Sequence, residues 1–154
     1  MAKRSKKGEL SFYSLFSGGI ILQALGRPWL EVEERLLTCF EQYPHRGEPI
    51  AHLIDYYLSK KEWSVGYIYS QYAREQLFGR TPNQDKWAVD EKFYAWRCLD
   101  VHTAICFSLQ KMQEATETYK MLYQTTMEHP DWFHPNEINR IHSHRNLFRK
   151  VAKI

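Results

Sequence analysis

Four polar residues in one short segment have side chains that could do chemistry: His45, Glu48, His52 and Asp55. Imidazole and carboxylate groups act as general acids and bases, and they also bind metal ions. Within YPHRGEPIAHLIDYY, Glu48, His52 and Asp55 stand at positions i, i+4 and i+7, which is one face of one helix. The segment is therefore either a site or the polar face of a helical repeat, and the surrounding elements must distinguish the two.

The composition is that of one globular domain with many aromatic residues. The chain has 154 residues, of which 44% are hydrophobic and 15% aromatic, and its net charge of +3 does not by itself indicate nucleic-acid binding. Cys39, Cys98 and Cys106 are odd in number and form no CxxC pair. This favours reduced, buried thiols in a cytoplasmic protein over a disulfide framework.

The N-terminal segment has two interpretations. Residues 1–10 are rich in basic residues and predict a flexible tail ahead of a single domain over residues 11–154. The basic head and the apolar stretch after it also resemble a secretion signal. Ser14, Gly18 and Gln23 interrupt that stretch, which favours a helix of the folded domain.

Proline residues mark the expected helix boundaries. Pro28, Pro49 and Pro135 each stand at the start of a segment that is expected to be helical, where a missing N–H costs nothing. No segment alternates apolar and polar residues over the length of a strand. The chain is therefore expected to be all-α.

A repeat of 34 residues runs through these helices. Trp29 and Trp63 are separated by this period, which is that of a tetratricopeptide-type helical hairpin. Gly66 and Ala115 occupy the same small-residue position in two later units, and the extra residues between them coincide with a loop insertion over residues 78–92. The pattern predicts about three stacked antiparallel hairpins and a C-terminal capping helix, and an ordinary helical bundle is the alternative.

Three motifs carry a family resemblance. They are PHRGEP (residues 44–49), YAWRCLD (residues 94–100) and RIHSHRNLF (residues 140–148). With the segments around them, they make residues 24–148 resemble the tetratricopeptide-like domain found beside family-2-type glycosyltransferases in bacterial, phage and giant-virus proteins.

The resemblance implies an accessory module and not the transferase itself. A transferase domain would need a nucleotide-sugar fold with strands, usually with an Asp-x-Asp metal motif, and the chain has no D-x-D. The expected function is a non-catalytic protein-interaction module or scaffold of a glycosyltransferase system, with no cofactor and no membrane span. Two alternatives stay open: a part of a larger glycosyltransferase that holds the glycan acceptor, and a basic nucleic-acid-binding helical module.

Binding is expected in a groove lined by the first helices of successive hairpins. Glu48, His52 and Asp55 share one helix face, and Arg97 and Asp100 occupy the equivalent face of the next unit. No nucleophile, base and orienting group can be recognised together. The sequence therefore predicts binding of a protein segment or a glycan acceptor, and no catalytic residue.

Other residues suggest weaker candidates. The seven histidines lack the spacing of a structural zinc site, so no metal site is predicted. Trp87, Trp132 and Phe133 lie in expected loops, where their rings either anchor the loop or stack on a sugar or partner chain. A possible basic patch comprises Arg140, Arg145, Arg149 and Lys150. These residues either bind nucleic acid, which is the more specific interpretation, or stabilise the C-terminal end of a capping helix.

Overall fold

The structure, a computed structural model, describes residues 6–85 and 87–149, and within these ranges it contains helices and no strand. The all-α prediction is therefore confirmed. No helix in these ranges is both long enough and apolar enough to cross a membrane. The helices are α1 (Lys6–Ala24), α2 (Trp29–Gln42), α3 (Glu48–Ser59), α4 (Trp63–Tyr72), α5 (Cys98–Ser108), α6 (Met112–Glu128), α7 (Pro135–Ser143) and α8 (Arg145–Phe148).

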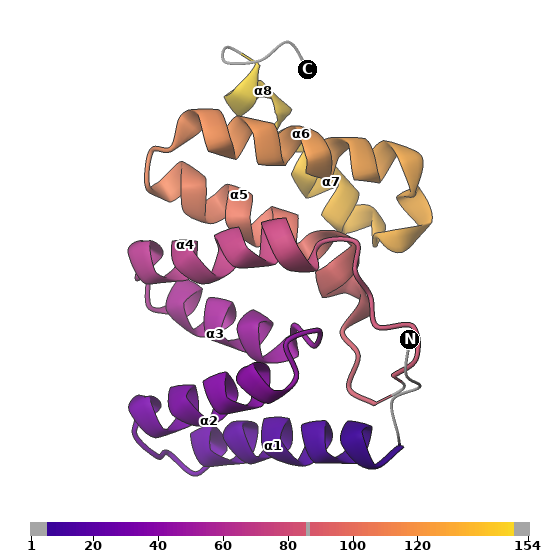
Figure 1. The fold of residues 1–154 in the computed structure, drawn as a ribbon. Coiled ribbons are helices and arrows are strands. Elements are labelled where there is room, and N and C mark those ends of the chain that lie inside the picture. The colour runs from indigo at the N-terminus through magenta and orange to yellow at the C-terminus, as the bar shows by residue number, and fades with distance from the viewer. Residues whose placement is uncertain (1–5, 86, 150–154) are drawn as a thin grey trace.

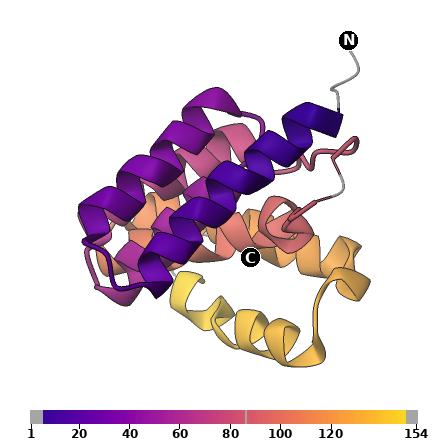
Figure 2. The same cartoon turned by 90° about the horizontal axis from the view of Figure 1, so that it is seen from below.

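Consecutive helices pack against each other along the whole chain. Contacts join α1 to α2, α2 to α3, α3 to α4, α4 to α5, and α5 to α6. Figure 1 shows the result as layers, with α1 and α2 at one end, α3 and α4 in the middle, and α5 and α6 at the other end. Figure 2, seen from below, shows α1 and α2 side by side and α7 apart from α2.

The segment over residues 78–92 interrupts this succession, and we call it the insertion. Two short π-helical turns flank it: η1 (Ala73–Leu77) continues α4, and η2 (Phe93–Arg97) leads into α5. Gly79 adopts a φ of +74°, a left-handed conformation that favours glycine, and its N–H donates to the Tyr94 carbonyl. Figure 1 shows the insertion running along one side of the layers toward the N-terminal end of α1.

Both ends of the chain differ in detail from expectation. Residues 6–10 open α1 and do not form a tail, whereas residues 1–5 lie outside the described residues. The capping helix expected after Pro135 is divided at His144 into α7 and α8. A capping box fixes the start of α7, because the His134 ring accepts from the Asn136 N–H and the Glu137 carboxylate accepts from the His134 N–H.

The core contains apolar residues from every layer. Val32 and Leu36 of α2, Leu53 of α3, Leu99 of α5 and Leu122 of α6 are all at most 1% exposed. Their three- and four-residue spacing turns one face of each helix inward. The core therefore holds the helices in fixed positions for the polar groups between them.

Two helical glycines should respond in opposite ways to substitution. A Cβ on Gly66 would lie 3.3 Å from Ile105 Cδ1, so Gly66→Val should overpack the α4–α5 contact and cost about 1–3 kcal/mol. A Cβ on Gly18 would meet nothing closer than Arg35 Nη1 at 3.5 Å, so Gly18→Ala should stabilise by about 0.5–1 kcal/mol. Urea unfolding of both variants checks this, and a stable Gly66→Val protein would contradict it.

Candidate functional site

The PHRGEP motif forms a buried polar cluster and not a groove wall. Arg46 is 0% exposed and Glu48 is 4% exposed. Arg46 Nε donates to Glu48 Oε1 at 2.8 Å, and the Tyr94 hydroxyl donates to the same oxygen at 2.9 Å. The Gly47 N–H donates to the Tyr94 hydroxyl at 2.7 Å, which closes the network. The Glu48 carboxylate is therefore engaged in hydrogen bonds within the protein.

The same cluster holds the insertion in place. Arg46 Nη1 donates to Asp85 Oδ2 at 3.1 Å, and Arg46 Nη2 donates to the Trp87 carbonyl at 2.7 Å. Glu48 Oε2 accepts from the Asp90 N–H at 3.1 Å. The Arg46 guanidinium also lies over the Phe12 ring of α1, at 3.9 Å from its centroid. We call Arg46, Glu48, Asp85 and Tyr94 the Arg46 cluster.

The other groove candidates on α3 have separate partners. His52 Nε2 is hydrogen-bonded to the Gln23 side chain of α1, whereas Asp55 is exposed and lies 3.3 Å from Arg97 Nη1. Arg97 also pairs with Asp90 at the end of the insertion. The predicted common face of Glu48, His52 and Asp55 is therefore divided: Glu48 faces inward, His52 faces α1, and only Asp55 meets Arg97.

Asp100, one of the groove candidates, forms an ion pair with Arg140 of the predicted basic patch. Arg140 Nη2 of α7 lies 2.6 Å from Asp100 Oδ2 of α5, so the charge of Arg140 is paired. Arg145 lies over the Tyr123 ring, and Arg149 is exposed. Lys150 lies outside the described residues. Any basic patch on these helices is thus partly neutralised, and its role in binding stays a prediction.

A cavity of about 640 Å³ lies where the insertion meets η2, the end of α6 and the short 3-10 helix η3 (Pro130–Trp132). Volumes of this order are typical of ligand pockets. Its apolar lining comes from Phe78, Ala95, Trp96 and Trp132, and its polar lining includes both acidic and basic side chains. The charged members of this lining are Glu91, Lys92 and Glu128.

Two tryptophans give this cavity a distinctive chemistry. Trp132 is 42% exposed, and its ring is stacked on His129 at a centroid distance of 3.8 Å. Trp96 is 3% exposed and packs on Phe133, and its indole N–H has no hydrogen-bond partner among the described residues. Of the rings expected in loops, Trp132 therefore faces solvent at the cavity and Phe133 is a core anchor.

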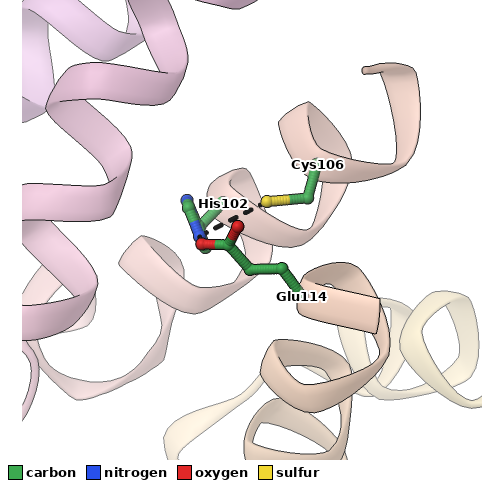
Figure 3. A group of neighbouring side chains, drawn as sticks. All are labelled: His102, Cys106 and Glu114. Carbon is green, nitrogen blue, oxygen red and sulfur yellow. Dashed lines mark hydrogen bonds and ion pairs between the residues drawn. The ribbon is translucent and has the colours of Figure 1, made fainter. Parts of the chain in front are cut away.

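A second polar group lies in the α5–α6 hairpin (Figure 3). His102, Cys106 and Glu114 point toward one another, and their donor atoms all lie within 4.8 Å of each other. His102 and Cys106 are fully buried, whereas Glu114 is partly exposed. His102 Nε2 lies 3.0 Å from Glu114 Oε1 and 3.3 Å from Cys106 Sγ.

This group is unsuited to nucleophilic catalysis. Burial raises the pKa of the Cys106 thiol to about 12, so the thiolate is not formed near neutral pH. Burial is also the largest influence on His102, and it lowers the pKa of that imidazole. Burial by itself raises the pKa of Glu114, but hydrogen bonds from Tyr67 and His102 outweigh it and lower that pKa. A neutral imidazole beside a carboxylate is suited to binding a cation.

The sequence signal for this group is a mixed set of ligand types and not a pair of histidines. His102 and Cys106 stand four residues apart in HTAIC, which places both on one face of a helix. Glu114 follows the turn after that helix, and a tight hairpin returns it to the same face. Mixed His, Cys and Glu spacing across a predicted hairpin is the pattern that identifies it.

Comparison of the chain with protein-family models, with curated proteins and with solved structures finds no match. The resemblance to a glycosyltransferase-associated tetratricopeptide-like domain therefore rests on the motifs of the sequence alone.

Proposed function

We propose that this protein is a non-catalytic interaction module with a tetratricopeptide-like architecture, and that it serves a glycosyltransferase system. The all-α succession of helices supports the architecture, because α2 and α4 begin at Trp29 and Trp63, which are one repeat period apart. The family-like motifs support the glycosyltransferase link. The absence of a recognisable catalytic triad in the sequence supports binding over chemistry.

The cavity between the insertion and α6 carries this proposal. A partner polypeptide inserts an apolar side chain between Trp132 and the floor formed by Phe78 and Trp96. Glu91, Lys92 and Glu128 then meet the polar backbone and the charged residues beside it. Large aromatic side chains at a pocket contribute most of the affinity in such interfaces.

One observation favours a glycan acceptor as the second candidate ligand. Exposed aromatic rings stack on the apolar faces of sugars, and Trp132 is exposed and backed by His129 at the cavity. Asn83 and Thr81 of the insertion line the same cavity and supply polar groups for hydroxyls. The insertion would then select the acceptor of a neighbouring transferase.

Trp132→Ala should weaken capture of the partner by about 30-fold or more, since a hot-spot tryptophan contributes about 2 kcal/mol or more. The partner is first identified by a photo-cross-linking residue at Asn83 in the full chain in its native host. The affinity of this partner for the wild-type protein and for the Trp132→Ala variant is then measured by titration. Phe133 remains to anchor η3 on Trp96, so the variant should keep its fold.

Matched controls make this test specific. Trp87 is 47% exposed but does not line the cavity, so Trp87→Ala should leave the affinity unchanged. A cross-linker at Lys60 samples the α3–α4 turn, which Figure 1 shows at the opposite end of the helices. Capture of the same proteins from Asn83 and Lys60, or equal effects of the two tryptophan variants, would contradict the proposal. Binding that collapses with rising salt would instead indicate nucleic acid.

A further inference from the structure

Two of the three donor–donor distances among His102, Cys106 and Glu114 are close to those of a metal coordination shell. A tetrahedral zinc ion with bonds of about 2.0–2.3 Å holds its nitrogen, oxygen and sulfur ligands about 3.3–3.6 Å apart. In this structure Nε2 and Oε1 are 3.0 Å apart, and Sγ and Nε2 are 3.3 Å apart. The third pair, Cys106 Sγ and the Glu114 carboxylate, lies within 4.8 Å, so small movements of the side chains would form the shell around an ion.

Two helices position these donors with little freedom. His102 and Cys106 are one turn apart on α5, and both are 0% exposed. Glu114 lies in the first turn of α6, after a short connection over residues 109–111. Figure 3 shows the two α5 side chains and the α6 side chain converging on one point.

The neighbours of the group orient it as outer partners orient metal ligands. His102 Nδ1 lies 2.7 Å from Ser70 Oγ, and that hydroxyl donates to the Tyr67 carbonyl at 3.2 Å. When Nε2 binds a metal ion the ring hydrogen stands on Nδ1, and Ser70 Oγ accepts it while its own hydrogen is used on the Tyr67 carbonyl. Tyr67 donates to Glu114 Oε2 at 2.7 Å, which leaves Oε1 directed at Nε2.

The charges of the group also fit a divalent cation. His102 Nε2 and Glu114 Oε1 lie 3.0 Å apart and share one hydrogen in the metal-free chain, and a divalent cation between them takes the place of that hydrogen. Arg74 Nη1 lies 3.9 Å from Glu114 Oε1, at the edge of ion-pair distance, and Lys111 lies over the Tyr67 ring. Nitrogen, sulfur and carboxylate donors together are the ligand set of zinc.

We propose that His102 Nε2, Cys106 Sγ and Glu114 Oε1 bind one Zn²⁺ ion per chain, with a fourth position open to water beside the partly exposed Glu114. The ion ties α5 to α6 and stabilises that hairpin. The Cys106 S–H proton is released to solvent as the S–Zn bond forms. This site is separate from the cavity, and it goes beyond the interaction function.

Cobalt substitution tests the site on the full chain without any partner. Protein freed of metal with a chelator is titrated with Co²⁺, which should give one ion per chain, with tetrahedral visible bands and a thiolate charge-transfer band. Cys106→Ser should abolish the charge-transfer band. Cys98→Ser is the matched control, because Cys98 is also 0% exposed on α5 but is not in the group.

Zinc competition measures the affinity directly. Glu114→Gln keeps a side chain that can accept from Tyr67 and should lower Zn²⁺ affinity more than tenfold, and Ser70→Ala should lower it about 10–100-fold while retaining the charge-transfer band. Circular dichroism checks that each variant is folded. No cobalt spectrum in the wild-type protein, a charge-transfer band that persists in Cys106→Ser, or equal losses in Cys98→Ser would overturn the proposal. Partner capture is measured separately, so either proposal can fail alone.

Discussion

Replacing Arg46 with methionine is expected to lower the free energy of unfolding by about 3–5 kcal/mol. Arg46 is fully buried, and it is the cation that contacts two carboxylates, Glu48 and Asp85, which are 4% and 5% exposed. Replacing Arg46 leaves both carboxylates buried without the guanidinium group that they contact. Burial by itself lowers the pKa of Arg46, but its contacts with Glu48, Tyr94 and Asp85 together outweigh burial and raise that pKa, so Arg46 stays cationic.

Urea unfolding measures the loss, and an exposed ion pair provides the control. Arg27 and Glu31 form an i, i+4 pair on the surface, so Arg27→Ala should cost no more than about 0.5 kcal/mol. A loss below about 1 kcal/mol in Arg46→Met would show that the cluster contributes little beyond the packing of its side chains.

The same variant should disturb the insertion more than the rest of the chain. Arg46 contacts residues 85 and 87 of the insertion, and Glu48 contacts the Asp90 N–H. Amide hydrogen exchange should therefore rise first over residues 78–92. Because the insertion lines the cavity, capture of the partner should weaken as well, which connects the buried PHRGEP motif to the proposed function.

The second large effect is expected in alkaline solution. Burial raises the pKa of Cys39 to about 11 and the pKa values of Cys98 and Cys106 to about 12, from 9.0. Each thiol keeps its proton in the folded state after the unfolded chain has lost it. The contribution of each thiol to the free energy of unfolding is therefore fully present below pH 9 and is lost as the pH rises through the pKa of the folded state.

The magnitude follows from the number of thiols. Each group contributes a slope of up to about 1.4 kcal/mol per pH unit, so the three together approach about 4 kcal/mol per pH unit between about pH 10 and 11. Burial also raises the pKa of Tyr57 and Tyr119 to about 12, which steepens the loss above pH 10. The free energy of unfolding is measured in urea across this range with a chelator present.

A single-cysteine variant separates this effect from general alkaline damage. Cys98→Ala should reduce the slope by about one thiol's share, about 1.4 kcal/mol per pH unit, whatever it does to the stability at neutral pH. An unchanged slope in that variant, or a free energy of unfolding that stays level up to about pH 10.5, would show that burial does not keep the thiols protonated.

Features set by neighbouring residues could be predicted from the sequence. The helices that begin at Trp29, Glu48 and Pro135 follow from proline positions and three- and four-residue apolar spacing, since backbone hydrogen bonds and side-chain faces depend on residues within one turn. The all-α class was determined in this way. The repeat spacing also predicts a small residue at Gly66, but its neighbour Ile105 is supplied only by the packing of α5 on α4.

Features set by distant residues required the tertiary structure. The partners of Arg46 lie about 40 residues away in the insertion, and Glu48 turns inward because Arg46, the Tyr94 hydroxyl and the Asp90 N–H all donate to it. A helical wheel placed Glu48, His52 and Asp55 on one face, but a face contacts different neighbours along its length. The proposed zinc site also depends on a tertiary contact. His102 and Cys106 are neighbours on α5, but only the packing of α6 brings Glu114 to them.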